Sequence, residues 1–378
     1  MANPKVLIFI DWFSPGYKAG GPITSNRNIV DHLRDDFDIY LLTSDMDYND
    51  DKPYESISPN CWGKHYGVNV CYLSRSHQNF STIKRIVREI DCDVWYINGI
   101  YSRNFSMLPL FISSILSPRK VVVAARGMLS PHALCVKPMP KRVYLTIAKV
   151  LGLFRSVVFH AASVAERGHI ESIFKNNEVL LIENLPKKGV SSSFITPKEG
   201  REVRLVSFAR ISSEKNTLYA LQCLKYCKAR VIYDIYGQVN SDDYWHQCCE
   251  VIEQLPKNVV VNYRGSVTPD EISKYYTQYH LLYLPTTGEN FGHAIFESLL
   301  NSTPVVISDQ TPWRNLVDLG VGWDLSLEDQ RAFSAVIDRC ADMTFEEYKD
   351  LAERSYQYAE NYSKNSAALS QYKELFKH

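Results

Sequence analysis

The chain has 378 residues, too many for one ordinary hydrophobic core, and this length predicts about two domains. Its 42 Lys and Arg residues balance 42 Asp and Glu residues, so no overall field draws it to nucleic acid or to an anionic membrane, and an anionic ligand must be held by local charges. The nine cysteines form no CxxC pair and no zinc-type spacing with histidine, which indicates reduced thiols in a cytoplasm.

Short β-rich runs alternate with helix-length segments from the N-terminus onward. The first run follows Met1 to Lys5, which is neither a signal peptide nor a membrane span, so we expect a cytosolic protein. Because the runs are almost continuously apolar, we expect strands buried on both faces of a parallel sheet. In the first half of the chain the expected strands are residues 6–10, 38–42, 68–72, 93–97, 120–124, 157–159 and 179–182.

Polar residues follow several of these strands, at the edge where open α/β sheets bind ligands. Gly20 and Gly21 end the loop after the first strand. They form no GxGxxG fingerprint, so a classical NAD site is disfavoured, but they could present N–H groups to a phosphate or sugar, or form a flexible turn. Asn98 and Arg126 lie on the same rim, where we place an acceptor. His132 follows the same strand as Arg126, although a lone histidine is more often structural than catalytic.

Residues 137–155 form an apolar segment of helix length with five basic side chains. Arg142 and Lys149 share one face, whereas Arg155 points the opposite way on a helical wheel. This pattern favours a partly buried helix over a helix lying on a membrane surface.

Two Asp-x-Asp triplets, residues 45–47 and 91–93, could suggest a metal that bridges a nucleotide diphosphate. The second triplet enters its strand from the amino end, which is the wrong side for a ligand. The first is followed by a polar, acidic loop. We interpret both as structural and expect no metal site.

Residues 186–200 are rich in Pro, Gly, Ser and Lys, which suits an exposed linker. From about Thr344 the pattern is purely helical, so these helices must pack on the domains formed by the preceding residues. The sequence therefore predicts two doubly wound α/β units in series, residues 1–185 and 201–355. The expected strands of the second unit are residues 203–207, 230–234, 259–262, 280–284 and 304–307.

Two constellations of the second unit lie between the end of an expected strand and the start of a helix. Arg210 and Lys215 could both reach a diphosphate and neutralise the charge that grows as it departs. The loop that contains Glu289, Asn290 and Phe291 forms the second constellation. Each charged residue alone is more often a solvated surface group, but two such sites on one sheet favour a phosphate-bearing ligand.

Glu289 and Glu297 stand eight positions apart around a Phe-Gly pair. A carboxylate accepts two hydrogen bonds, so one glutamate suits sugar hydroxyls and the other suits the vicinal diol of a ribose. Gly292 would let the backbone approach a pyrophosphate closely. An ordinary loop followed by a solvated helix glutamate is the competing interpretation of this spacing.

Together these segments resemble a retaining glycosyltransferase of family 4 (glycosyl transferases group 1) over nearly the whole chain. The most specific part is Gly288 to Asp309, a Glu, seven residues, Glu block followed by a Pro-Val-Val strand. The resemblance implies the GT-B fold, an α/β architecture of two Rossmann-like parallel-sheet domains facing a cleft. It also implies that residues 356–378 form a helix that packs back on the N-terminal, acceptor-side domain.

The resemblance assigns roles to individual positions. Glu289 would contact the donor sugar and Glu297 the ribose, with the base near Gly237 and Val267. The remaining assignments are Arg210 and Lys215 on the diphosphate, Gly20 and Gly21 in the glycine loop, and His132 near the sugar.

Two positions depart from the family pattern, and neither touches the donor contacts. Asn184-Leu-Pro replaces the usual Pro-Asn-Gly at the interdomain crossing. Ser302 replaces a glycine, and we expect the neighbouring Asn301 to take the left-handed conformation that ends the helix.

The resulting hypothesis is retaining transfer of a hexose-type sugar from a nucleoside diphosphate sugar to a glycan or lipid-linked acceptor. No metal and no other cofactor is expected, because the protein cations stabilise the departing diphosphate. A bacterial surface polysaccharide pathway, in the cytoplasm or at the inner face of the membrane, follows from the resemblance only. A nucleotide-sugar 2-epimerase and a non-catalytic sugar-binding protein are the alternatives.

Overall fold

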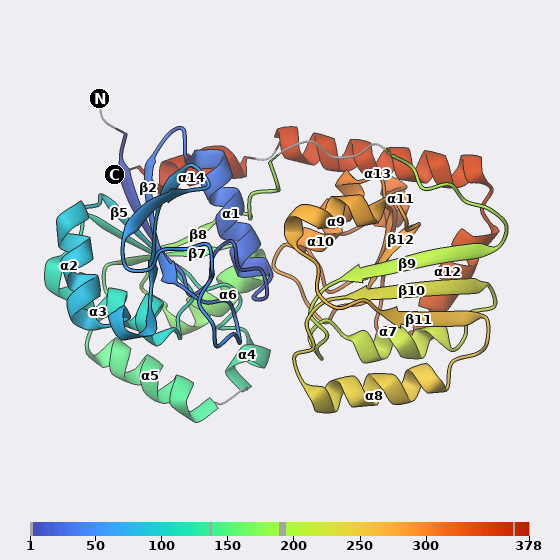
Figure 1. The fold of residues 1–378 in the computed structure, drawn as a ribbon, viewed down its shortest axis with the longest axis horizontal. Coiled ribbons are helices and arrows are strands. Elements are labelled where there is room, and N and C mark those ends of the chain that lie inside the picture. Colours follow the sequence, from blue (N-terminus) through green and yellow to red (C-terminus); the bar gives the residue numbers. More distant parts are fainter. Residues whose placement is uncertain (1–2, 136–137, 189–193, 366, 378) are drawn as a thin grey trace. The chain divides into compact units, whose positions relative to one another are not determined.

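The computed structural model describes residues 3–135, 138–188, 194–365 and 367–377 (Figure 1). The chain divides into two compact units. Unit 1 comprises Met1–Lys188 with Ala367–His378, and unit 2 comprises Gly189–Ser366. Each unit is a mostly parallel sheet covered by helices on both faces, as predicted from the continuous apolar character of the strands.

Unit 1 contains an eight-stranded sheet with the order β3-β4-β2-β1-β5-β6-β7-β8. Its strands are β1 (Lys5–Phe9), β2 (Asp38–Ser44), β3 (Trp62–His65), β4 (Val68–Leu73), β5 (Val94–Asn98), β6 (Lys120–Ala124), β7 (Val157–Ala161) and β8 (Val179–Leu181). Neighbouring strands are parallel except β3 and β4. The seven expected strands are confirmed. The sequence analysis missed β3 because its residues, Trp-Gly-Lys-His, form no apolar run.

The helices of unit 1 lie in two layers. Those that share one core with the sheet are α2 (Phe80–Ile90), α3 (Leu108–Leu116), α5 (Pro138–Val150) and α6 (Val164–Ile173). The opposite face is covered by α1 (Gly21–Leu33) and α14 (Ala368–Leu375). Short helical turns occupy Arg75–His77, Arg103–Met107 and α4, Pro131–Cys135. Side-chain caps begin α2 and α6, where Asn79 accepts from the Thr82 N–H and Ser163 from the Glu166 N–H.

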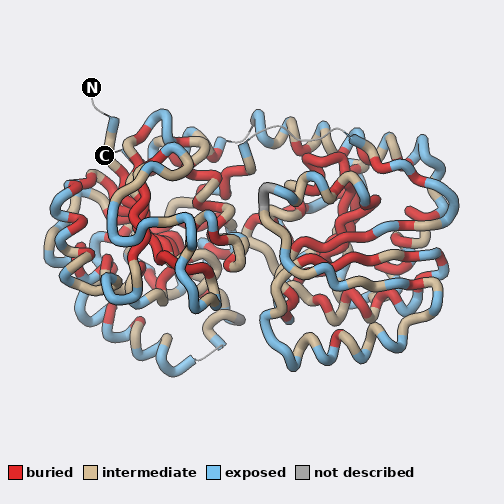
Figure 2. The backbone as a smooth tube through the Cα atoms, viewed as in Figure 1, coloured by how far each residue is buried: buried red, intermediate tan, exposed pale blue. Residues whose placement is uncertain are grey.

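Unit 2 contains a six-stranded parallel sheet with the order β11-β10-β9-β12-β13-β14. Its strands are β9 (Glu202–Phe208), β10 (Arg230–Tyr236), β11 (Val259–Tyr263), β12 (Leu281–Leu284), β13 (Val305–Ser308) and β14 (Gly322–Leu325). The five expected strands are confirmed, and the short edge strand β14 was missed. Figure 2 shows that the buried residues follow these strands.

The helices of unit 2 also form two layers. One core is shared with α7 (Thr217–Leu224), α8 (Asp242–Glu253) and α12 (Gln330–Asp342). The other is shared with α9 (Pro269–Tyr276), α10 (His293–Leu300), α11 (Leu316–Leu319) and α13 (Phe345–Asn365). At the end of α10 the expected geometry is wrong in one detail. Asn301 has a φ of −102°, and it is Ser302 that adopts the left-handed conformation, with a φ of 55°.

The C-terminal segment divides between the units. Ala359 of α13 is buried in unit 2, together with Tyr358 and Tyr362 packed against the same core. In α14, Tyr372 and the adjoining Phe376 are fully buried in the core of unit 1. The expected helix over residues 356–378 is thus the end of one helix on unit 2 and a second helix on unit 1.

This packing makes Phe376 a test of how much α14 stabilises unit 1. The ring lies edge-on to Tyr96 and to Phe37, so we expect Phe376→Ala to lower the free energy of unfolding by about 3–5 kcal/mol. Urea denaturation measures this loss. The control is Lys373→Ala, which removes an ion pair to Asp36 between partly exposed side chains and should cost at most about 1 kcal/mol. Equal losses for both variants would show that the α14 core contact is unimportant.

Candidate functional site

Four loops of unit 2 meet at the carboxyl edge of its sheet, following β9, β10, β11 and β12. Backbone hydrogen bonds tie the first three together. The Ile211 N–H donates to the Gln238 carbonyl at 2.9 Å, and the Gly237 N–H donates to the Gly265 carbonyl at 2.9 Å. This edge is where helix N-termini point their unpaired N–H groups, so the donor-side residues predicted in these four loops are gathered at one edge.

Gly237 allows the β9 and β10 loops to approach this closely. A Cβ atom at this position would lie 1.8 Å from the Ala209 carbonyl oxygen and 2.6 Å from its carbonyl carbon. Both are backbone atoms of the loop that carries Arg210, so neither can move aside alone. Only glycine fits here, and the predicted position of the base lies against the backbone beside the predicted diphosphate residues.

Lys215 and Glu289 form the central ion pair of this edge. Lys215 Nζ lies 2.6 Å from Glu289 Oε1, and the two side chains are only 16% and 12% exposed. The backbone holds the two loops in register, because the Thr287 N–H donates to the Glu214 carbonyl at 2.9 Å and Asn216 Nδ2 donates to the Pro285 carbonyl at 3.0 Å. Two residues predicted from separate motifs are therefore in direct contact.

Arg210 lies on the same loop as Lys215 and is more open to solvent. Its Nη2 lies 3.6 Å from Glu214 Oε2, and its side chain is 31% exposed. Glu214 is also 3.8 Å from Lys215 Nζ. The two cations are thus matched by two carboxylates, and the site keeps Arg210 accessible for an anion that competes with Glu214.

Gly292 caps α10 in a left-handed conformation, with a φ of 79°. An added Cβ would lie 2.8 Å from Ile295 Cδ1 and 3.3 Å from Trp313 Nε1. The indole N–H of Trp313 donates to the carbonyl of Phe291, whose ring is buried among Phe296, Trp313 and Tyr362. Phe291 is thus an anchor for the loop, and its side chain is turned into the core rather than toward a ligand.

The other donor-side predictions occupy the same edge. Asn290 immediately follows Glu289 in the β12 loop and is partly exposed. Val267 lies in the β11 loop and packs against the core that contains Tyr236. Glu297 is partly exposed on α10, where its carbonyl accepts from Asn301 Nδ2 at 2.7 Å.

A buried carboxylate, Asp234, connects the carboxyl ends of β10 and β11. It is 5% exposed and accepts hydrogen bonds from Asn262 Nδ2 at 2.7 Å, Tyr279 Oη at 2.7 Å and Arg264 Nε at 3.0 Å. The hydrogen bond and the charge of Asp234 raise the pKa of Arg264. A buried carboxylate is stable only when it is paired in this way, so this cluster fixes the strands beneath Gly237 and Gly265.

In unit 1, Gly20 and Gly21 begin α1 as predicted. The Gly20 N–H donates to the Tyr17 carbonyl at 2.9 Å, so it is used within the turn. Gly21 is the first helical residue and is exposed, and such N–H groups have no partner within the helix. Asp47 shapes the loop by accepting from the N–H groups of Tyr17 at 2.8 Å and Lys18 at 3.2 Å.

Arg126 and Asn98, which we expected on the acceptor side, contact each other. The Arg126 guanidinium donates to Asn98 Oδ1 at 3.0 Å, to Asn184 Oδ1 at 2.6 Å and to Tyr96 Oη at 3.0 Å. Asn98 also exchanges two amide hydrogen bonds with Asn26 of α1. Both side chains therefore serve the interior of unit 1 and connect α1 to the crossing segment at Asn184.

His160 completes this network in one tautomer. Its Nε2 lies 2.8 Å from the Ile182 carbonyl, which can only accept, so Nε2 carries the proton. Its Nδ1 then accepts from Tyr96 Oη at 2.7 Å, and that oxygen in turn accepts from Arg126. Burial and the nearby Arg126 charge lower the pKa of His160 to about 3, so the imidazole is neutral.

The predicted sugar-side histidine, His132, lies in α4. Its side chain falls outside what the structure describes, and its role stays a prediction.

One aspartate of each Asp-x-Asp triplet binds neighbouring protein groups. Asp47 binds the glycine loop as above, and Asp93 accepts from the Lys5 N–H at 2.9 Å and from Arg119 at 2.7 Å. Among the described residues, no group of three or more Asp, Glu, His or Cys side chains is arranged to hold a metal ion.

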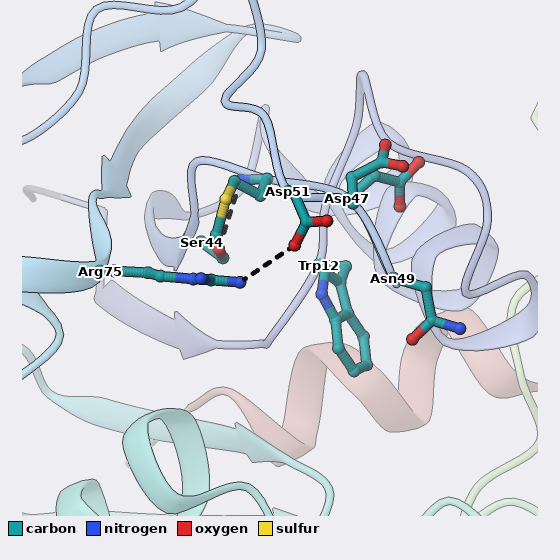
Figure 3. Close-up of a pocket in the computed structure, with 8 residues that line it drawn as sticks. Trp12, Ser44, Asp47, Asn49, Asp51 and Arg75 are labelled. Carbon is teal, nitrogen blue, oxygen red and sulfur yellow. Dashed lines mark hydrogen bonds and ion pairs between the residues drawn. The ribbon is translucent and has the colours of Figure 1, made fainter.

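A polar hollow of about 520 Å³ lies at the carboxyl edge of the unit 1 sheet (Figure 3). Its walls come from the segments after β1, β2 and β4, and they combine an indole, carboxylates, an amide and a guanidinium. The lining residues are Trp12, Ser44, Met46, Asp47, Asn49, Asp50, Asp51 and Arg75. Aromatic faces with planar polar groups around them suit a carbohydrate ring.

Asp11 precedes Trp12 and was missed in the sequence analysis. It follows β1 after Ile10, and one of its carboxylate oxygens accepts from the Ser102 hydroxyl after β5. Burial raises the pKa of Asp11 to about 6, although the Ser102 hydrogen bond lowers it. A lone aspartate after a strand is a common turn residue. Only the hydrogen bond with Ser102, which follows β5, distinguishes Asp11 from such a residue.

Comparison with known proteins links this site to a family model. Residues 191–358 match the family model described as glycosyl transferases group 1. This match covers less than half of the chain. It contains all four loops described above in unit 2, from Arg210 to Glu297.

Solved structures and a curated protein extend the likeness to the whole chain. Anabaena HepE in complex with UDP and glucose is 16% identical, with a TM-score of 0.70 over 99% of this chain and 98% of that one. Sucrose-phosphate synthase from Thermosynechococcus elongatus is 14% identical, with a TM-score of 0.70 over 99% and 98%. An uncharacterized 41.2 kDa protein in the cps region of Klebsiella pneumoniae is 20% identical over 82% of this chain and 88% of its own length. The chain therefore has the two-domain GT-B fold of glycosyltransferases.

Asp11 offers a pH test within unit 1. Its pKa is about 6 in the folded state against a usual 3.8, so between these values the unfolded state ionises while the folded state stays protonated. Wild-type protein should therefore lose stability relative to Asp11→Asn as the pH rises from about 4 to 6, by about 3 kcal/mol in total, and hold a constant difference above about 7.

Urea unfolding of both proteins at pH 4.5, 5.5, 6.5 and 7.5 measures this difference. The control is Asp51→Asn, because the Asp51 side chain is 98% exposed. A wild-type to Asp11→Asn difference that does not change with pH would show that the Asp11 carboxyl is well solvated.

Proposed function

We propose that this chain is a retaining glycosyltransferase that moves a hexose-type sugar from a nucleoside diphosphate sugar to a glycan or lipid-linked acceptor. The Lys215–Glu289 pair, within the region that matches the glycosyl transferases group 1 model, carries the proposal. HepE has been crystallised with UDP-glucose, and this favours a UDP-sugar donor. The relative in a cps region favours surface polysaccharide synthesis in the cytoplasm or at the inner face of the membrane.

Lys215 and Arg210 would bind the diphosphate of the donor. An ammonium has three N–H donors, so Lys215 can keep its contact with Glu289 and still bind phosphate oxygens. Arg210 would exchange Glu214 for the phosphates. When the bond from the anomeric carbon to the phosphate oxygen breaks, its electron pair stays on the diphosphate, and both cations stabilise the added charge without a metal ion.

Glu289 would orient the donor sugar. One of its oxygens is held by Lys215, and the carboxylate can accept from sugar hydroxyls through its remaining lone pairs. Glu297 would accept from the ribose hydroxyls. For retention, the departing diphosphate oxygen would take the proton of the acceptor hydroxyl on the same face of the sugar.

The hollow of unit 1 would hold the acceptor. Trp12 supplies an aromatic face, while Asn49 and Asp51 supply groups that accept from or donate to hydroxyls. This assignment replaces the acceptor role first expected for Asn98 and Arg126, since their side chains are used inside unit 1.

The first experiment is thermal unfolding with UDP, GDP, ADP or CMP, each with EDTA and with magnesium. A ligand at 100 times its dissociation constant should stabilise the protein by about 2.7 kcal/mol. We expect a shift with UDP that survives EDTA. Product analysis without an acceptor then separates the enzyme classes, because an epimerised nucleotide sugar would identify an epimerase. The absence of any nucleotide shift would favour a non-catalytic sugar-binding protein.

Glu289→Gln tests the role of the carboxylate in turnover. Loss of its charge should lower kcat by about 10²–10³-fold while the dissociation constant of the nucleoside diphosphate stays within about threefold, because Lys215 remains. Transfer kinetics and calorimetric titration measure the two quantities.

The matched control is Glu202→Gln. Glu202 is also in ion pairs, with Arg204 and Arg230, but it lies at the amino end of β9. Its replacement should leave kcat within about twofold of the wild-type value. Wild-type turnover by Glu289→Gln would remove the proposed role of Glu289.

A further inference from the structure

The hollow of unit 1 keeps hydrogen-bonding groups of both kinds open to a ligand. Ser44 lines it and is 7% exposed. The Ser44 hydroxyl oxygen accepts from the Met46 N–H at 3.3 Å and from Gln78 Nε2 at 3.2 Å, so its own O–H is left to donate. Asn49 adds an amide that can donate and accept (Figure 3). A sugar hydroxyl, which donates and accepts at once, can use both kinds of group.

Trp12 gives the hollow an aromatic ring of fixed orientation. The rings of Trp12 and Tyr48 pack edge to face, with centroids 5.0 Å apart and planes at 81°. Asp47 in turn holds Tyr48 by accepting from its N–H at 2.7 Å. Trp12 is still partly exposed and lines the hollow. A sugar ring that stacks on this indole therefore meets a side chain whose position is already set, and little conformational entropy is lost on binding.

Carboxylates outnumber cations in the lining of the hollow. The lining carboxylates are Asp47, Asp50 and Asp51, and the lining cation is Arg75. Asp47 is 5% exposed. The hydrogen bonds that it makes with the described residues all come from backbone N–H groups. Its negative charge at the wall of the hollow is therefore not paired with a hydrogen-bonded cation.

The two cations at the hollow already interact with carboxyl groups. Lys18 Nζ donates to Asp50, and the two side chains are 26% and 36% exposed. Arg75 Nη2 lies 3.8 Å from Asp51 Oδ1. Burial raises the pKa of Asp45 and the Arg75 charge lowers it, so Arg75 also acts on a second carboxyl group. An anion that entered the hollow would have to compete with these carboxylates for each cation.

We propose that the hollow selects an acceptor whose terminal sugar carries no anionic group, and that it excludes uronic acids and phosphorylated sugars. The inference rests on the proposed function, because it names the acceptor of that reaction. A carboxylate or phosphate only accepts hydrogen bonds and would face Asp47 and Asp51 as a like charge. Hydroxyl groups use the donors and the acceptors of the hollow together. An ammonium in place of a hydroxyl would also fit these carboxylates.

Binding of methyl glycosides to the full chain tests the proposal without the transfer reaction. The probes are methyl β-glucoside with methyl β-glucuronide, and the corresponding galactose pair. The members of each pair differ only in a hydroxymethyl or a carboxylate group. In titrations followed by ligand-observed NMR at low salt, we expect the uncharged member to bind more tightly by about fivefold or more, and the ratio should fall at high salt. Trp12→Ala should weaken binding of the uncharged glycosides about tenfold.

Asp50→Asn tests the role of charge directly. The change removes the partner of Lys18, so the hollow gains one positive charge, and the preference for the uncharged glycoside should fall by about fivefold. The matched control is Glu89→Gln, which breaks the Arg85–Glu89 pair on α2 and should keep the wild-type preference. The UDP shift in thermal unfolding checks that every variant is folded and binds nucleotide.

Four results would overturn the proposal. The first is a uronide that binds as tightly as its uncharged partner. The second is binding that Trp12→Ala leaves unchanged, because the sugar would then lie elsewhere. The third is the same preference in Asp50→Asn and Glu89→Gln. The fourth is no binding of any uncharged glycoside while UDP still shifts thermal unfolding. That outcome would remove the hollow as the acceptor site and leave the donor site in place, whereas loss of the UDP shift would contradict the proposed function itself.

Discussion

The donor-side geometry depends on the close backbone approach at the carboxyl edge of the unit 2 sheet. Gly237 lies against the Ala209 carbonyl with no room for a Cβ atom, and this contact sets the loop that carries Arg210 and Lys215. The same loop holds the β12 loop through the Glu214 carbonyl. The 2.6 Å contact of Lys215 with Glu289 is thus a consequence of backbone positions rather than of two flexible side chains that happen to meet.

The N-terminal unit uses its corresponding edge differently. Arg126 is turned inward, where it joins strand ends to the crossing segment through Asn184. Its guanidinium donates to neutral acceptors, and the charge of the buried Glu166 also favours its charged form. The neutral His160 fits this arrangement, because a second positive charge beside Arg126 would be unfavourable. The polar hollow beyond β1, β2 and β4 is left as the open part of this edge.

The sequence predicted the strands well because buried parallel strands are continuously apolar, a signal that requires no tertiary knowledge. It missed β3 and β14 because short edge strands are half solvated and carry polar residues. Lys215 and Glu289 were found because each follows a strand whose direction could be predicted. The hydrogen bonds of Arg126 could not be predicted, because its partners Tyr96 and Asn184 come from distant segments. Asp11 gave no signal for the same reason, since its hydrogen-bond partner Ser102 also comes from a distant segment.

The charges of the donor edge also explain why two carboxylates lie beside two cations in a site proposed for an anion. Without a ligand, Arg210 and Lys215 would repel each other across a partly buried loop, and Glu214 and Glu289 offset that repulsion. Glu214 is 48% exposed and Glu289 is 12% exposed, so water can solvate the first far better than the second. An arriving diphosphate would therefore displace Glu214 at little cost, while Glu289 would stay fixed on Lys215. The unequal burial of the two carboxylates thus separates a replaceable counter-ion from a positioned one, and only the positioned one can orient a sugar.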